Sequence, residues 1–132
     1  MDRLFVDSLP ARVNGNERLV WRGRHVSTTF LIQYGAQACI VQIDKGRVNR
    51  VAIVPPEFSD WAFALRASQQ AWGLFFSEIP PPGFHDLMAM LKLKHLKMEG
   101  DLYPLMSHLL YFKDVLASLR NSGSIPSVGA SQ

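Results

Sequence analysis

The sequence contains one cysteine and no long apolar run, and both absences limit what the protein can be. Cys39 lies in an apolar stretch and has no partner for an internal disulfide, so we expect a buried, inert thiol in a reducing compartment. No segment reaches the about 18 apolar residues that span a bilayer. Residues 1–7 include an early acid and no apolar core, which argues against a signal peptide. These features favour a bacterial-type cytoplasmic protein.

Catalytic and metal-binding motifs are also missing. There is no glycine-rich phosphate loop, zinc-protease motif or nucleophile elbow. The four histidines, His25, His85, His95 and His108, are scattered along the chain. We therefore expect no catalytic residue, no metal site and no cofactor. A small enzyme that uses His85 or His95 with a nearby carboxylate is a rival hypothesis, and it would require a polar cleft with perturbed pKa values.

What the chain does contain is enough apolar residues for one domain with a substantial core. Of its 132 residues, 48% are hydrophobic and 19% are charged, with a formal net charge of +3. The densest basic stretch holds Arg12, Arg18, Arg22 and Arg24, and only Trp21 interrupts it. A solvated surface explains this stretch better than a nucleic-acid site, which usually adds several aromatic platforms. We expect no nucleic-acid partner and at most peripheral contact with membranes.

The middle of the chain has the pattern of β-strands. Residues 26–34, 38–43, 48–54 and 61–67 are rich in β-branched and aromatic residues, with turn signals between them. Asp44-Lys45-Gly46 is a typical turn between antiparallel strands. The short connections predict a meander of four consecutive strands. In the fourth strand, alternation predicts that Trp61, Phe63 and Leu65 share one face.

Helical spacing dominates the rest of the chain. Ser68 is a candidate N-cap for a helix that carries Trp72 and Phe75, and Phe84 opens the apolar pattern of a second helix. Residues 95–99 form a short extended run. Asp101 can cap one long final helix that continues to about residue 119, with Pro104 inside its first turn. At the start of the chain, we expect a short helix that stops before Pro10.

The extended run and the helix after it resemble a known family. Residues 96–101, "LKMEGD", followed by an apolar helix that passes through "LLYF", are similar to the "LKVxGD" segment of the sterol carrier protein type 2 (SCP2) domain. The order of strands and helices before this segment is also similar. The resemblance covers residues 25–120. It leaves residues 1–24 as a partly helical or irregular segment and residues 121–132 as a disordered tail.

The resemblance implies an α+β fold, in which a five-stranded, largely antiparallel sheet is covered by helices that enclose an apolar cavity. Such domains are not catalytic and hold a sterol, fatty acid, acyl-CoA or isoprenoid-like ligand. Two departures from the family pattern are expected. The family's N-terminal amphipathic helix is short or missing, and an insertion at residues 78–83 lengthens the connection between the two middle helices.

Aromatic and thioether side chains of the second half of the chain are the candidate lining of that cavity. The predicted ligand-binding residues are Trp61, Phe63, Trp72, Phe75, Phe76, Phe84, Met88, Leu91, Met106, Leu109, Leu110 and Phe112. A polar head group would lie at the mouth, near Arg66, Lys92, Lys94 or Lys97. These aromatic residues could equally pack against one another as an ordinary core. The alternative function is an accessory or oligomerisation module, such as a homodimer, whose apolar helix binds a protein partner without a ligand.

Overall fold

The computed structural model describes the backbone of residues 2–120 and the side chains of residues 8–120, so the predicted tail at 121–132 lies outside the described residues. The helices are α1 (Asp2–Asn14), α2 (Glu17–Arg22), α3 (Gln69–Phe75), α4 (Leu87–Lys92), α5 (Tyr103–Ser107) and α6 (Leu109–Ala117). The strands are β1 (Ser27–Tyr34), β2 (Gln37–Asp44), β3 (Arg47–Val54), β4 (Phe63–Ala67) and β5 (Leu96–Gly100).

The five strands form one sheet in the order β3-β2-β1-β4-β5. The pairs β1–β2, β2–β3 and β4–β5 are antiparallel, which confirms the largely antiparallel sheet. The predicted meander is wrong at its fourth strand, because β4 lies parallel to β1 and not beside β3. A parallel pair needs a crossover, and residues 55–62 supply it by passing over the sheet from one edge toward its centre.

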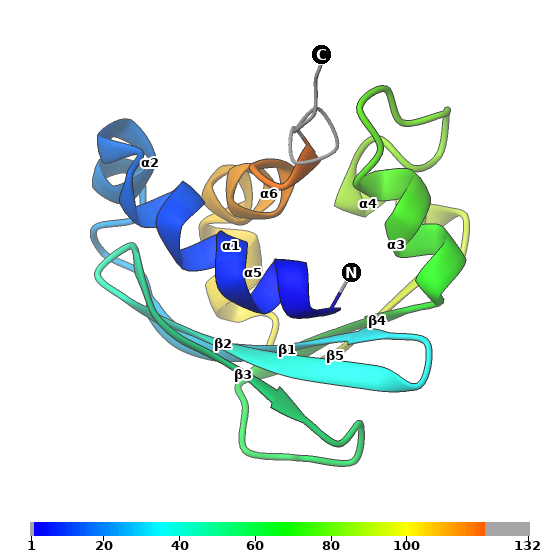
Figure 1. Cartoon of the computed structure of the whole chain (residues 1–132), viewed down its shortest axis with the longest axis horizontal. Coiled ribbons are helices and arrows are strands. Elements are labelled where there is room, and N and C mark those ends of the chain that lie inside the picture. Colours follow the sequence, from blue (N-terminus) through cyan, green and yellow to red (C-terminus); the bar gives the residue numbers. More distant parts are fainter. Residues whose placement is uncertain (1, 121–132) are drawn as a thin grey trace.

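The two faces of the sheet are covered differently. The helices lie together on one face, whereas the loop between β3 and β4 lies on the other (Figure 1). Alternation along β1 sends Phe30 and Ile32 into the main core under the helices, and Leu31 into a smaller cluster on the outer face. Ala64 of β4 belongs to that outer cluster, which Phe58 of the loop partly covers.

Three phenylalanines form the centre of the main core. The rings of Phe30 and Phe63, on neighbouring strands, are stacked with centroids 5.1 Å apart. Phe112 of α6 meets both rings edge-on at 5.5 Å. All three side chains are fully buried. Edge-to-face pairs of this kind add about 0.5–1.5 kcal/mol to the gain from burial, so the cluster fixes α6 on the sheet.

The N-terminal segment is more helical than the sequence indicates. We expected a helix that stops before Pro10 and a short or missing N-terminal helix, and both expectations are wrong, because α1 continues through Pro10 to Asn14. Pro10 removes one intrahelical hydrogen bond. The burial of Leu9 and Val13 in the main core compensates for that loss. Asn14 also exchanges two hydrogen bonds with the backbone of Val48, of 2.8 and 3.0 Å, and so ties α1 to β3.

The "GD" step after β5 closes the strand and starts the C-terminal helices. Gly100 has φ +87°, and a Cβ atom there would meet the carbonyl oxygen of Ala62 at 2.5 Å, so the position requires glycine. Asp101 Oδ1 accepts a 3.1 Å hydrogen bond from the Tyr103 amide, and Pro104 lies in the first turn of α5. The single long helix is wrong, however. His108, with φ −131° and ψ 41°, separates α5 from α6, and Leu105 and Phe112, on either side of this break, are both buried in the core.

Candidate functional site

The structure brings most of the predicted lining residues together under the helices. Phe63, Trp72, Phe75 and Phe112 are buried in the main core. Phe76, Phe84 and Leu109 pack against that core and are partly buried. Met88 and Leu91 of α4 are also partly buried. The first seven of these residues therefore belong to one region, between the sheet and the helices, whereas Leu91 lines a hollow at the α4–β5 corner.

Three predicted lining residues lie elsewhere. Trp61 does not share a face with Phe63 and Leu65, because it precedes β4 and packs with the outer cluster. Alternation places a residue only within a strand, and Trp61 belongs to the loop, where its indole N–H donates to the Phe58 carbonyl oxygen at 2.6 Å. Met106 and Leu110 point away from the core, with 41% and 67% of their surfaces exposed.

Helix α3 carries the densest group of aromatic rings in this region. Ser68 caps the helix, as predicted, and its hydroxyl oxygen accepts a 3.0 Å hydrogen bond from the Ala71 amide. The Trp72 indole N–H donates to the carbonyl oxygen of Gln33 at 2.7 Å, which fixes this side chain over β1. Phe76 is stacked on Trp72 with centroids 5.6 Å apart, and Phe75 meets both rings edge-on. The indole N–H of the buried Trp72 thus has a hydrogen-bond partner, while Phe76 is only partly buried, at the edge of the main core.

The interior is mostly apolar. Among residues 8–120 no charged side chain is buried, and the buried polar atoms include the hydroxyls of Tyr34 and Tyr111. Five hollows of about 270 to 460 Å³ lie at the surface, and none of them is lined by Phe63, Trp72 or Phe112. Phe63, Trp72 and Phe112 themselves are fully buried. Any molecule that enters the interior must be apolar, because burying a polar group there without a partner costs several kcal/mol.

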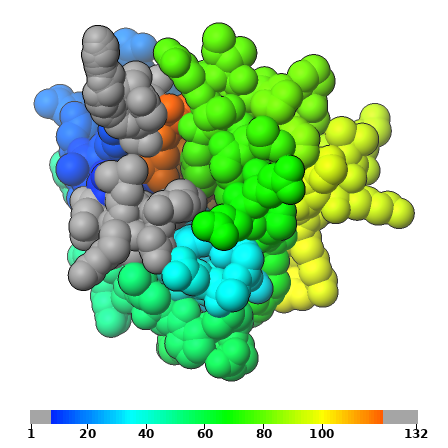
Figure 2. Space-filling view, turned by 45° about the vertical axis from the view of Figure 1, so that its right-hand side comes forward, coloured from blue at the N-terminus to red at the C-terminus, as the bar shows by residue number. Residues whose placement is uncertain are grey.

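Polar contacts join α6 to the segment that holds α3 and α4. Figure 2 shows α6 in orange between the blue N-terminal helices and the green segment. Lys113 of α6 forms an ion pair of 3.0 Å with Asp86, the N-cap of α4. After α6, Arg120 donates to the carbonyl oxygens of Phe75 and His85, each at 2.7 Å. We call these three interactions the closure contacts. They surround a hollow of about 270 Å³.

The charged groups at the closure contacts, Asp86 and Arg120, have pKa values shifted by their neighbours and by burial. Burial acts to raise the pKa of Asp86, but the hydrogen bonds from Met88 and Lys113 and the Lys113 charge outweigh it, so the pKa falls below its ordinary value. Burial lowers the pKa of the Arg120 guanidinium, and Asp86 partly opposes this effect. Arg120 also lies over the Phe75 ring, 4.3 Å from its centroid. No sequence pattern indicates this role of Arg120, because its acceptors are backbone carbonyl oxygens.

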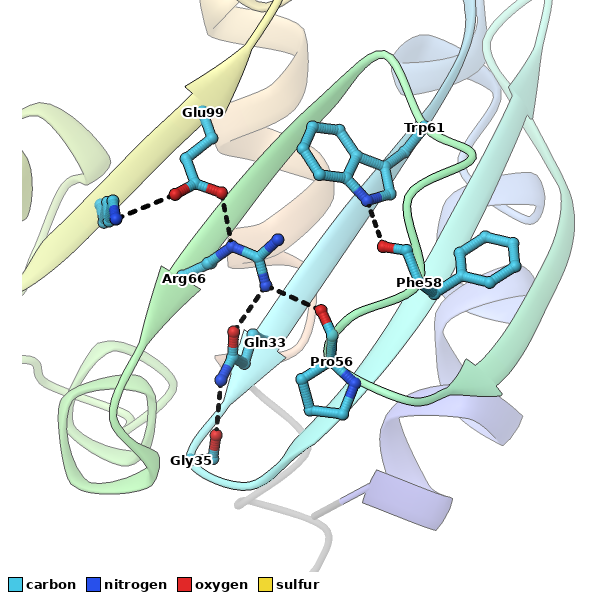
Figure 3. A network of polar contacts seen from close by, with 8 residues as sticks. Gln33, Gly35, Pro56, Phe58, Trp61, Arg66 and Glu99 are labelled. Carbon is cyan, nitrogen blue, oxygen red and sulfur yellow. Dashed lines mark hydrogen bonds and ion pairs between the residues drawn. The ribbon is translucent and has the colours of Figure 1, made fainter.

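A second polar network lies on the outer face of the sheet. Arg66 of β4 donates to Glu99 of β5 at 2.7 Å, to Gln33 of β1 at 2.6 Å and to the Pro56 carbonyl oxygen at 3.1 Å (Figure 3). Lys97 forms a further ion pair with Glu99, and hydrogen bonds from Lys97 and then Arg66 lower the pKa of Glu99. Arg66 thus ties the loop after β3 to two strands.

The basic residues predicted for a head group are partly brought together. Arg66, Lys94 and Lys97 line one hollow of about 430 Å³ at the α4–β5 corner, together with His95. Lys92 is exposed at the end of α4 and does not line this hollow. His95 is stacked on Phe84 with ring centroids 4.4 Å apart.

Within residues 2–120, no group of three or more His, Cys, Asp or Glu side chains is placed to hold a metal ion. No helix among the described residues is long and apolar enough to cross a membrane.

The arrangement defines a class of protein: an α+β domain with a mixed five-stranded sheet, helices on one face and an apolar interior between them. Neither a family model nor a curated protein matches the sequence. Solved structures do match the fold.

The chain has the fold of sterol carrier protein 2. A crystal structure of sterol carrier protein 2 superposes with a TM-score of 0.73 at 12% identity, and the match covers 88% of this chain and 93% of that one. The protein TT1886 from Thermus thermophilus, described as a possible sterol carrier protein, matches with a TM-score of 0.69 at 14% identity, over 95% of this chain and 90% of that one. The sec-alkylsulfatase Pisa1 from Pseudomonas sp. matches with a TM-score of 0.55 at 15% identity, over 86% of this chain but 16% of its own.

Proposed function

We propose that the protein is a non-catalytic lipid carrier that holds a sterol, fatty acid, acyl-CoA or isoprenoid-like molecule between the sheet and the helices. The observation that supports this proposal is the mostly apolar interior, without a buried charged side chain among residues 8–120, under the helices of a sterol-carrier fold. A long-chain lipid gains about 0.8 kcal/mol for each CH₂ group that it buries there. This gain is the driving force for binding, and no reacting group is required.

The binding region would include the seven predicted residues that pack together in or against the main core. Phe63, Trp72, Phe75 and Phe112 lie deepest, and Phe76 lies at the edge. The five hollows described above do not reach Phe63, Trp72 or Phe112, so a ligand that enters from one of them must displace side chains to contact these residues. Apolar ligand sites usually have about 300–1,000 Å³ of space.

The boundary between α6 and the α3–α4 segment is the favoured route for a ligand. The closure contacts made by Lys113 and Arg120 hold the two sides together there, and the hollow beside them is lined by Phe75 and Leu87 of the core. Breaking polar contacts at a partly exposed boundary costs much less than separating buried apolar surfaces. Outward movement of α6 would therefore open the interior from this side.

Native mass spectrometry of the purified protein, followed by organic extraction, is the first test. A lipid mass near one per chain is expected. A protein without bound lipid that also takes up no fluorescent fatty acid would contradict the carrier function. Such a result, together with a concentration-dependent mass, would favour the accessory or oligomerisation module.

A pair of matched variants then locates the site. Phe76→Trp enlarges a partly buried side chain at the edge of the inner region, and Phe58→Trp enlarges a partly buried side chain on the outer face of the sheet. We expect Phe76→Trp to weaken fatty-acid binding and Phe58→Trp to leave it unchanged. Equal effects of the two variants on affinity would show that the ligand does not occupy the inner region.

A further inference from the structure

An exposed apolar surface lies at the end of the molecule formed by α2, α5 and α6. Seven large apolar side chains are strongly exposed among the described residues, and four of them are at this end: Trp21 (64%), Tyr103 (77%), Met106 (41%) and Leu110 (67%). The other three lie on separate elements. Met106 and Leu110 line a hollow of about 420 Å³ together with Arg22. Clustering of this kind marks an interaction surface.

The same end of the molecule is rich in arginine. Arg18, Arg22 and Arg24 come from α2 and the residues just after it, and all three are exposed. Arg22 forms an ion pair with Asp114, which holds α2 against α6. The Arg24 guanidinium lies over the Trp21 ring, 3.7 Å from its centroid, and also donates to the Trp21 carbonyl oxygen at 2.9 Å. Two arginines of the basic stretch therefore lie beside exposed apolar side chains: Arg24 beside Trp21, and Arg22 in the hollow lined by Met106 and Leu110.

The turn between β2 and β3 adds two further cations to this end. Tyr111 of α6 donates its hydroxyl proton to the Gly46 carbonyl oxygen at 2.7 Å, and the Gly46 amide donates to the carbonyl oxygen of Val26, just after α2. These bonds hold Lys45 and Arg47, both exposed, beside the end of α2. Asp44 and Glu17 only partly offset the local positive charge.

We propose that this surface docks on an anionic phospholipid membrane. We call it the docking face and define it by Trp21, Arg24, Tyr103, Met106 and Leu110. Aromatic and aliphatic side chains can enter the head-group region while arginines contact lipid phosphates. A second copy of the chain fits less well, because a two-fold interface would bring the arginines of one face against those of the other. Single-stranded nucleic acid could use Trp21 and Arg24 but would leave Met106 and Leu110 in water.

This inference concerns the outer surface and does not depend on a lipid inside the domain. If the carrier function holds, the docking face would bring the protein to the membrane from which it takes its ligand. The carrier function is tested by extraction of bound lipid, and docking is tested by binding to vesicles. A negative result in one test therefore does not contradict the other proposal.

Co-sedimentation with vesicles tests the proposal. We expect binding to vesicles of phosphatidylcholine and phosphatidylglycerol in equal parts, and much weaker binding to phosphatidylcholine alone. Leu110→Glu should weaken the binding about tenfold or more, because an apolar contact is replaced by a charge that the lipid repels. Arg24→Gln should weaken it about fivefold on the anionic vesicles only. The matched control is Ile79→Glu, since Ile79 is 86% exposed in the α3–α4 connection and should affect binding little.

Three outcomes would overturn the proposal. The first is that the unchanged protein does not sediment with anionic vesicles. The second is that Ile79→Glu weakens binding as much as Leu110→Glu does. The third is that Leu110→Glu dissociates a homodimer in solution, with vesicle binding unchanged. Circular dichroism of each variant establishes that it is folded, and both mutated apolar side chains are exposed enough for folding to be preserved.

Discussion

Arg120 holds the end of α6 against the α3–α4 segment, and replacing it with methionine should loosen that boundary. The substitution keeps most of the apolar length and removes two charge-assisted hydrogen bonds, to Phe75 and His85. Such bonds contribute up to about 1.5–3 kcal/mol each when buried. The cation–π contact with Phe75 contributes about 0.5–1 kcal/mol at an exposed site. Because Arg120 is only partly buried, we expect a total loss of about 2 kcal/mol.

Urea unfolding measures the free energy of unfolding directly, and thermal unfolding should show Tm lowered by about 8 °C for a domain of this size. Stopped-flow uptake of a fluorescent fatty acid measures access to the interior. If α6 moves outward to admit the ligand, Arg120→Met should speed uptake while lowering stability. The control is Arg47→Met, which changes an exposed residue at the start of β3. A variant as stable as the unchanged protein, or one with slower uptake, would refute this explanation of the closure contacts.

Two further predictions concern titratable groups. Burial raises the pKa of the Cys39 thiol to about 12, so it should not react with a thiol reagent in the folded protein at pH 8 and should react once urea unfolds the chain; rapid labelling of the folded protein would contradict this. Hydrogen bonds from Lys97 and Arg66 lower the pKa of Glu99 in the folded state, so the unfolded chain binds more protons in acid. This stability is present above the ordinary glutamate pKa of about 4.3 and is lost as the pH falls through the lower folded value. Glu99→Gln should therefore flatten the acid part of the stability profile measured by urea unfolding, and an unchanged slope would exclude a contribution from this carboxylate.

Local patterns in the sequence predicted those features that depend only on neighbouring residues, such as a strand, a helix cap or a turn. Richness in β-branched and aromatic residues placed Phe30 in a strand, and the Ser68 cap and the Gly100-Asp101 step mark real element boundaries. The pairing of β4 with β1 could not be predicted in this way, because it depends on how residues 55–62 cross the outer face. Trp61 was misplaced for the same reason. Pro10 shows the opposite case, in which tertiary burial of Leu9 and Val13 outweighs a local signal to end the helix.

The C-terminal segment is apolar around most of its circumference because it presents apolar side chains on two sides. A single long helix with one buried face would need apolar residues on only that face. Leu105, Phe112 and Leu116 follow the i, i+7, i+11 spacing of one helix face, and all three are buried in the core. Met106 and Leu110 are exposed and line a hollow together with Arg22. One apolar segment therefore serves two surfaces: its inner side completes the proposed lipid-binding interior, and its outer side forms part of the docking face.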